Sequence, residues 1–315
     1  MSKELHPMTL EAGHIDLLEG EVTRAITAWN EPIDTAHYTH LSPYQSCALT
    51  KLSDARDRIR TYGSKIKSLI WISDHKGLSR FDANVVNQLE CLCLQVPPRG
   101  VISSLNIARR NQKLQELYLR FDEHISKVPI LFHEFLGGHS ALEKLSLRSI
   151  KLKNFETLAK ICPQLRILFL SKVIFANEPG HRKVTAQLTN VKEIIFEQMM
   201  YIPGLIASCP QLEVVRLIQM KHAEEFPEEL VRELKLSGAR GLGICLTKQH
   251  PYGVAAVRDL ITRVIPEKDV PLQELRFDVA SEHIDLALEL REAYPAETHG
   301  AFQVTQAVIA EPFNF

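Results

Sequence analysis

Cysteine and histidine are the side chains of this sequence with the most reactive chemistry, and two pairs of them have the spacing of metal ligands. Cys91 and Cys93 form a Cys-x-Cys pair, and His37 and His40 would share one face of a helix. Neither pair is accompanied by further ligands at a suitable spacing in the neighbouring segments. We therefore expect no metal site and no cofactor.

A second candidate for cysteine chemistry is the tetrapeptide Cys-Pro-Gln-Leu, which begins at Cys162 and again at Cys209. The repetition is compatible with a paired redox or metal site. It is also compatible with a small buried residue at the end of a helix, followed by a proline that cannot continue that helix. The choice depends on the elements that carry the two copies.

Sequence motifs of the common enzyme classes are missing. The chain contains no Gly-x-Ser-x-Gly, no Gly-x-x-x-x-Gly-Lys and no His-Glu-x-x-His. The glycines of GARGLG, from Gly238, lack the spacing of a dinucleotide-binding loop. We therefore expect a protein that is not an enzyme.

Composition and charge restrict the partners and the compartment. The net charge is −1, from 37 Lys plus Arg and 38 Asp plus Glu, so we expect neither nucleic acid nor a membrane surface as a partner. No apolar stretch approaches the roughly 18 to 20 residues of a spanning helix. The 6 cysteines are scattered, and the chain has no Asn-x-Ser/Thr sequon. These features favour a cytoplasmic or nuclear location.

An internal repeat runs through most of the chain. Its pattern is L-x-x-L-x-L, with any aliphatic or aromatic residue at the three marked positions. Copies begin at Ile66, Leu89, Leu114, Leu142, Leu165, Val191, Leu212, Val231 and Leu272. Successive copies begin 19 to 28 residues apart, except for the last two, which are 41 apart and leave room for a degenerate unit, GLGICL, from Gly241. These periods are typical of leucine-rich repeats, and HGAFQV, from His299, is a weaker further copy.

Each unit is predicted to be a strand followed by a helix. After Leu142 the apolar residues Leu145 and Leu147 alternate with polar ones, as in a strand with one buried face. A helix is predicted next and ends before Pro163. Its apolar stripe consists of Leu152, Phe155, Leu158, Ala159 and Cys162. Cys162 and Cys209 then end helices two units apart, about 10 Å at the spacing of parallel strands, which is too far for a disulfide.

The predicted fold class is α/β: a leucine-rich-repeat solenoid, or horseshoe, with a parallel inner sheet and outer helices. Residues 63–315 form the array, with about ten irregular repeats. Residues 1–62 do not carry the pattern and are predicted to be a helical N-terminal cap, with amphipathic helices over 9–29 and 41–63. We expect a monomer.

The motif Cys-Pro-x-Leu-x-x-Leu-x-Leu resembles the cysteine-containing leucine-rich repeats of F-box/LRR proteins. RIRTYGSKIKSLIWI, residues 58–72, is similar to the first repeat of many fungal members, and the resemblance extends to about residue 310. The three-helix F-box is not recognisable before residue 58. The asparagine or cysteine usual at the eighth repeat position is mostly aliphatic here: Ile150, Val173, Met199 and Met220. The resemblance implies substrate recognition for a ubiquitin ligase, with a Skp1-type adaptor as a partner if an F-box exists upstream.

The strand alternation predicts which side chains form two rows on the concave face. The first row is Ile70, Cys93, Tyr118, Ser146, Phe169, Ile195, Arg216, Lys235 and Arg276. The second row is Ile72, Gln95, Arg120, Arg148, Ser171, Glu197, Ile218, Ser237 and Asp278. Large apolar side chains mixed with arginines are typical of protein-binding hot spots. The predicted contact residues are Tyr118, Arg120, Arg148, Phe169, Ile195, Glu197, Arg216 and Ile218.

Two functions fit these observations. The first is a non-enzymatic binding module that holds a protein or peptide on the concave face, as the substrate-recognition domain of an F-box-type ubiquitin ligase receptor. The alternative is a scaffold or inhibitor that resembles ribonuclease-inhibitor-type repeat proteins and has no link to ubiquitin.

Overall fold

The computed structural model describes residues 46–49, 67–71, 87–96, 101–121, 130–153, 155–175, 183–220, 226–246 and 254–279. The predictions for His37 and His40, for the copy at His299 and for most of the cap lie outside the described residues. No helix in these ranges is both long enough and apolar enough to cross a membrane.

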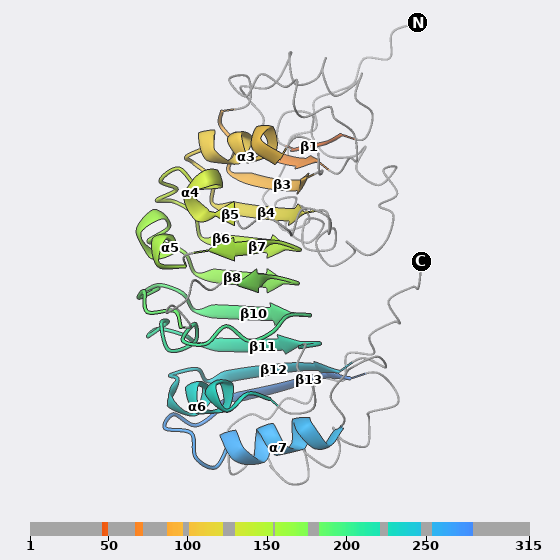
Figure 1. Ribbon diagram of the computed structural model, residues 1–315, viewed down its shortest axis with the longest axis vertical. Helices are drawn as coiled ribbons and strands as arrows, with labels where there is room; N and C mark the ends of the chain where they lie inside the picture. Colours follow the sequence, from red (N-terminus) through yellow and green to blue (C-terminus); the bar gives the residue numbers. More distant parts are fainter. Residues whose placement is uncertain are drawn as a thin grey trace, which may run out of the picture.

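The protein is an α/β structure built on a large parallel sheet. Ten strands stand side by side in the order β1-β2-β3-β4-β6-β8-β10-β11-β12-β13, so each strand pairs with the strands next to it along the chain (Figure 1). Their bounds are Ser46–Leu49, Ser68–Trp71, Cys91–Val96, Glu116–Phe121, Lys144–Arg148, Ile167–Ser171, Glu193–Glu197, Val214–Ile218, Gly241–Leu246 and Glu274–Val279. A parallel sheet with this order requires a crossover after every strand.

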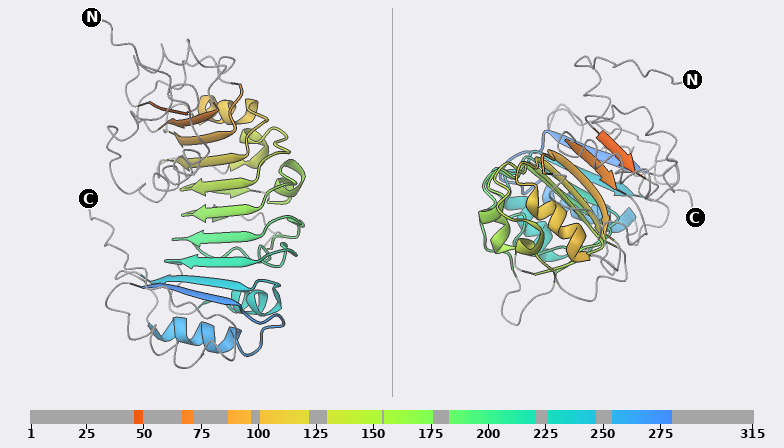
Figure 2. Two further views of the ribbon diagram at one scale, coloured as in Figure 1. Left: turned by 180° about the vertical axis from the view of Figure 1, so that it is seen from behind. Right: turned by 90° about the horizontal axis from the view of Figure 1, so that it is seen from above.

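The crossovers contain short helices and a second, small parallel sheet. The helices are α3 (Val101–Arg110), α4 (Phe132–Phe135), α5 (Glu156–Ile161), α6 (Glu228–Leu236) and α7 (Val254–Val264). The small sheet has the order β5-β7-β9, with bounds Ile130–Leu131, Lys151–Lys153 and Ile174–Phe175. Seen along the stack of strands, helices α3, α4 and α5 lie on one side of the large sheet (Figure 2).

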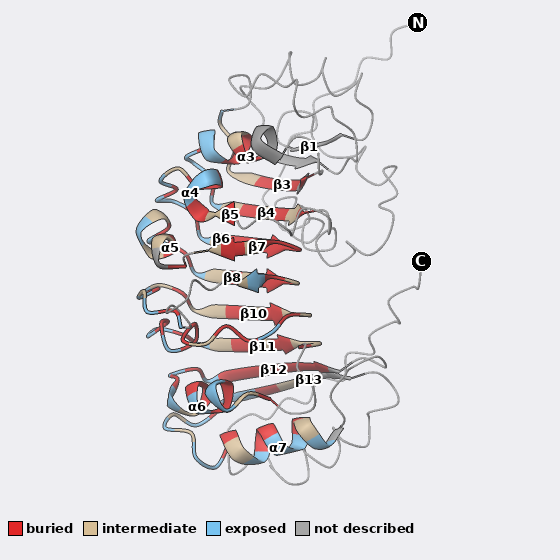
Figure 3. Cartoon of the chain, viewed as in Figure 1, coloured by how far each residue is buried: buried red, intermediate tan, exposed pale blue. Residues whose placement is uncertain are grey.

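The core fills the space between the large sheet and the crossovers. Every second residue of a strand points into it: Leu117, Leu119 and Phe121 of β4 are buried, and the residues between them are only partly buried. Phe132 packs edge-on against Phe155, with ring centroids 5.1 Å apart, and so joins two successive crossovers. Figure 3 shows this burial along the strands. Each unit therefore buries its apolar side chains mainly against its neighbours.

A four-residue turn precedes the strands and explains the repeated Cys-Pro-Gln-Leu. In both copies the leucine N–H donates to the cysteine carbonyl, at 3.2 Å for Leu165 and Cys162 and at 3.1 Å for Leu212 and Cys209. Proline occupies the second place of the turn, which its fixed φ favours. The same bond closes Asn111–Leu114, His139–Leu142 and Leu188–Val191. The motif is therefore a β-turn that leads into a strand.

A second turn follows the strands, and its backbone has an unusual conformation. The residue after each of four successive strands has a positive φ between 48° and 56°: Ser149, Lys172, Gln198 and Gln219. The N–H of Lys172 donates to the carbonyl of Glu197, the last residue of the next strand, at 2.9 Å. The residue that follows the positive φ is Ile150, Val173, Met199 or Met220, and all four are buried. These positions are thus apolar core, as their types predict.

Four local predictions can be compared with the described elements. VRELKL, from Val231, was predicted to be a strand and belongs to helix α6, so placing Lys235 and Ser237 on the sheet is wrong. GLGICL is strand β12, which confirms the degenerate unit. Ser46–Leu49 form strand β1, paired in parallel with β2, where a helix was predicted. Leu152, predicted as part of a helix, lies in strand β7.

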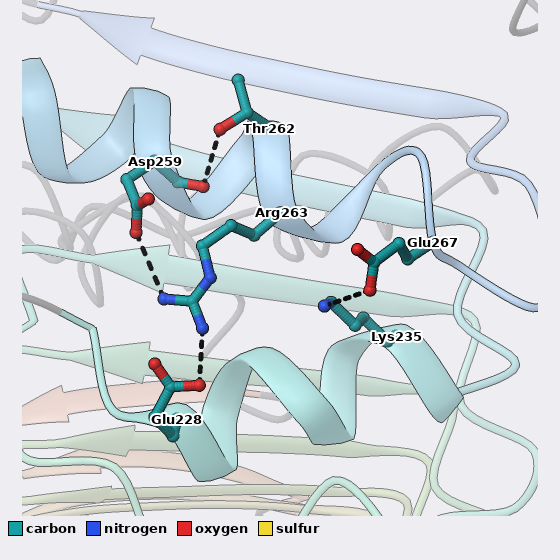
Figure 4. A network of polar contacts seen from close by, with 6 residues as sticks. All are labelled: Glu228, Lys235, Asp259, Thr262, Arg263 and Glu267. Atoms are coloured by element: carbon teal, nitrogen blue, oxygen red, sulfur yellow. Dashed lines mark hydrogen bonds and ion pairs between the residues drawn. The ribbon is translucent and has the colours of Figure 1, made fainter.

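Helix α6 carries charged side chains that meet helix α7 (Figure 4). Arg263 of α7 donates to Glu228 at 2.5 Å and to Asp259 at 3.3 Å, and Lys235 donates to Glu267 at 2.6 Å. These groups are largely exposed to water, which screens their attraction. The network therefore orients the two helices and contributes little to stability.

His139 connects two turns in the interior and predicts a dependence of stability on pH. Its Nδ1 accepts from the Gly137 N–H at 3.0 Å, and its Nε2 donates to the Ala108 carbonyl at 2.9 Å. Burial lowers the pKa of His139 below its ordinary value. As the pH falls below about 6.5, the unfolded chain takes up a proton that the folded chain resists. The stability contributed by neutral His139 is therefore lost in acid.

We expect the free energy of unfolding to fall between about pH 7 and pH 5, and to fall less in His139→Asn. We choose asparagine because Asn111 is the first residue of the turn Asn111–Leu114, as His139 is of the turn His139–Leu142. The Asn111 side chain accepts from the Leu89 N–H. Urea unfolding across this pH range measures the difference, with exposed His133→Asn as the control. Parallel pH profiles for the wild type and His139→Asn would contradict the assignment.

Candidate functional site

The face of the large sheet that points away from the buried core holds the predicted contact residues, and we call it the front face. It consists of Glu116, Tyr118 and Arg120 of β4 and the residues in register with them. One row runs Tyr118, Ser146, Phe169, Ile195, Arg216, Gly243 and Arg276. The next row runs Arg120, Arg148, Ser171, Glu197, Ile218, Cys245 and Asp278. All eight predicted contact residues therefore lie side by side on five adjacent strands.

The exposure of these side chains is uneven. Tyr118, Phe169 and Ile195 are partly exposed, as contact residues must be. Arg148 is only 5 % exposed and makes contacts within the protein. In this conformation it is unsuited to direct contact with a partner.

A third row on the same face was missed by the sequence reasoning. It lies two residues earlier in each strand and contains Glu116, Lys144, Ile167, Glu193, Val214, Gly241 and Glu274. The same alternation of strand residues predicts it, because residues two apart point to one side. The row adds two apolar side chains to the front face.

The apolar side chains of the three rows gather on strands β8, β10 and β11. We call this group the apolar strip, and all of its members are partly exposed. It consists of Ile167, Phe169, Ile195, Val214 and Ile218. Phe169 and Ile195 are in register and form its centre, whereas Glu193 lies between Ile167 and Val214, and Arg216 lies opposite Ile195.

Polar side chains lie beside the apolar strip and also within it, and they are fixed by contacts with one another. On one side the Glu116 carboxylate accepts from Lys144 at 2.6 Å and from the Tyr118 hydroxyl at 2.7 Å. Burial and the neighbouring Glu116 carboxylate raise the pKa of Tyr118 far above its ordinary value. Within the strip Arg216 of β11 donates to Glu193 of β10 at 2.5 Å. These contacts hold the polar side chains in one geometry before any partner binds.

Three buried polar atoms of the front face have no hydrogen-bond partner among the residues that the structure describes: Ser146 Oγ, Ser171 Oγ and Glu197 Oε2. Ser146 is 3 % exposed and Ser171 is 0 % exposed. Such atoms are rare in folded proteins because each one destabilises the fold by about 1–3 kcal/mol. Three such atoms on three adjacent strands indicate that stability alone does not account for the residues of the front face.

The cysteines of the described ranges do not form a reactive site. Burial raises the pKa of Cys162 and of Cys209 to about 12, so both are protonated thiols at neutral pH. Burial also raises the pKa of Cys93. Cys91 is partly exposed, and its Sγ donates to the Glu116 carboxylate at 4.0 Å. Within the described part of the chain, no group of three or more His, Cys, Asp or Glu is placed to hold a metal ion.

Comparison of the chain with models of protein families found no family that matches. A search among curated proteins likewise found no match. The candidate function therefore rests on the front face itself.

Proposed function

We propose that the chain is a leucine-rich-repeat solenoid that binds a protein or peptide through its front face and has no enzymatic activity of its own. The repeat assignment is supported by the parallel strands in chain order, the equivalent turn before the strands and the positive φ after four of them. In such an array each unit supplies one strand to a common binding surface.

The observation that carries the proposal is the apolar strip, with fixed polar side chains beside it and within it. A sheet face serving only as a solvated surface has no need of five large apolar side chains on three adjacent strands. Clustered apolar anchors surrounded by charged groups are characteristic of protein interfaces. The fixed polar side chains reduce the ordering that binding would otherwise require.

Capture of a partner tests the proposal. Phe169→Ala together with Ile195→Ala is expected to weaken capture from a cell lysate by more than about tenfold, because central interface anchors contribute about 2 kcal/mol or more each. The melting temperature should change little, since both side chains are partly exposed. Ile174→Ala is the matched control, because Ile174 is 53 % exposed and lies in β9, away from the front face. Equal capture by the wild type and the double variant would contradict the proposal.

The proposed cellular role is substrate recognition for an F-box-type ubiquitin ligase. Its support is the resemblance of the Cys-Pro-x-Leu-x-x-Leu-x-Leu units to those of F-box/LRR proteins. Co-purification of a Skp1-type adaptor with the full-length gene product tests this role. A captured partner without any adaptor would favour the alternative, a scaffold or inhibitor of the ribonuclease-inhibitor type.

A further inference from the structure

A groove of about 650 Å³ opens where strands β11, β12 and β13 begin. Three successive units line it: Pro210 to Val214 from the first, Gly238, Arg240 and Gly241 from the second, and Gln273 and Glu274 from the third. Val214 belongs to the apolar strip as well, so the groove continues the front face to the edge of the sheet.

Glycines lie in and beside the groove, in strand β12 and just before it. Gly241 and Gly243 are in register with Val214 and Arg216, where the neighbouring strand carries side chains. A Cβ atom at Gly238 would meet no atom closer than 3.9 Å, so the space beside it is open. At Gly241 a Cβ atom would lie 3.1 Å from Val214 Cγ2. The open space thus lies beside Gly238, and the Val214 side chain, which covers Gly241, supplies an apolar part of the floor.

The charges at the groove differ from those along the rest of this edge. Elsewhere the residues that immediately precede adjacent strands form ion pairs: Lys67 with Glu90 at 2.5 Å, Glu143 with Arg166 at 3.8 Å and Lys192 with Glu213 at 2.6 Å. Arg240 is the next residue of this series after Glu213, but the Glu213 carboxylate is already paired with Lys192. Within the described residues, the exposed side chains of Arg240 and Glu274 have neither a hydrogen bond nor an ion pair. The groove therefore offers one unpaired positive and one unpaired negative group.

We propose that this groove binds an extended peptide segment of a protein partner, with a large apolar side chain beside Gly238, an acidic side chain at Arg240 and a basic side chain at Glu274. Arg240 precedes strand β12, Glu274 begins strand β13, and both line the groove. A peptide that carries an acidic and a basic side chain can therefore meet both groups. The inference deepens the proposed function and rests on it.

Selection from a phage-displayed library of random linear peptides tests the proposal with three forms of the protein. The wild type should enrich peptides with a large apolar residue next to an acidic and a basic one. Gly238→Leu fills the groove and should weaken binding of these peptides by at least about tenfold, with unfolding by urea unchanged. Arg240→Glu combined with Glu274→Arg should select peptides in which the order of the two charges is reversed.

The outcomes separate this inference from the proposed function. In one outcome, the selected peptides bind Gly238→Leu and the charge-reversed variant as well as the wild type, but fail to bind the double variant Phe169→Ala with Ile195→Ala. That result would overturn the proposed groove site and leave the front-face function intact. A selection that enriches no peptide from the wild type also overturns the groove. The capture experiment at Phe169 and Ile195 then decides the proposed function by itself.

Discussion

Gly204→Ala is expected to lower the free energy of unfolding by about 2–5 kcal/mol, because it combines backbone strain with a collision. Gly204 has a φ of +82°, which side chains other than hydrogen rarely permit. A Cβ atom there would collide with the Val184 carbonyl oxygen and would lie 2.9 Å from the Val184 nitrogen. The Val184 N–H already donates to the Pro203 carbonyl at 2.9 Å, so this backbone cannot move aside without losing a hydrogen bond.

Gly138→Ala separates the two causes. Gly138 has a similar φ of +91°, but a Cβ atom there would have no atom within 4 Å. This variant should therefore show only the conformational strain, about 1–2 kcal/mol. Urea unfolding monitored by circular dichroism measures both variants. Equal losses of unfolding free energy in the two variants would show that the backbone near Gly204 shifts and relieves the collision without cost.

Glu233→Leu is expected to destabilise the protein by about 3–5 kcal/mol, because it leaves three donors without their acceptor, two of them buried. The carboxylate of Glu233 accepts from the Tyr201 hydroxyl at 2.6 Å, from the Gly204 N–H at 2.7 Å and from the Ala207 N–H at 3.0 Å. Glu233 is 3 % exposed and lies on helix α6, whereas its three donors belong to the preceding unit. The Glu233 carboxylate therefore connects two successive units by side-chain hydrogen bonds.

Two further variants define this effect. Glu233→Gln keeps one acceptor oxygen and should cost less than Glu233→Leu, and Tyr201→Phe removes one donor and should cost about 1 kcal/mol. Glu229→Gln, on the exposed side of the same helix, should remain within about 0.5 kcal/mol of the wild type. Thermal unfolding of the four variants gives the comparison. A loss of stability in Glu229→Gln as large as that in Glu233→Leu would contradict this explanation. It would show that any change in helix α6 destabilises the protein, whether or not it removes a buried contact.

The large sheet was predictable because its signal recurs. Eight of the nine pattern copies begin a strand, and the ninth, at Val231, fails because two periodicities coincide there. Val231, Leu234 and Leu236 satisfy the repeat pattern, while Leu230, Val231 and Leu234 satisfy the spacing of a helix. Pro227 and the acidic pair Glu228 and Glu229 begin that helix, and these start signals were present in the sequence.

Other features left no readable signal. Strands β5, β7 and β9 contain only two or three residues, which is too short for a period of two to be recognised. The positive φ after the strands is carried by Ser149, Lys172, Gln198 and Gln219, none of which is glycine or asparagine. Hydrogen bonds to the next strand impose this conformation, and they depend on contacts between units.

The candidate site was partly predictable for the same reason. Strand alternation placed Tyr118, Phe169 and Ile195 on one face, and the register confirms that placement. It did not reveal that Arg148 is buried, since burial depends on what surrounds a residue in space. The groove was missed because its informative residue is a glycine, Gly238, beside which the space is open.

The strand order has a consequence for how the protein folds while the ribosome synthesises it. From β2 onward, every described strand of the large sheet pairs with one that was synthesised before it. No strand has to wait for a distant partner, so each unit can dock as soon as it leaves the exit tunnel, while the growing edge is still a single strand. Synthesis and folding can therefore advance in the same direction and at the same pace.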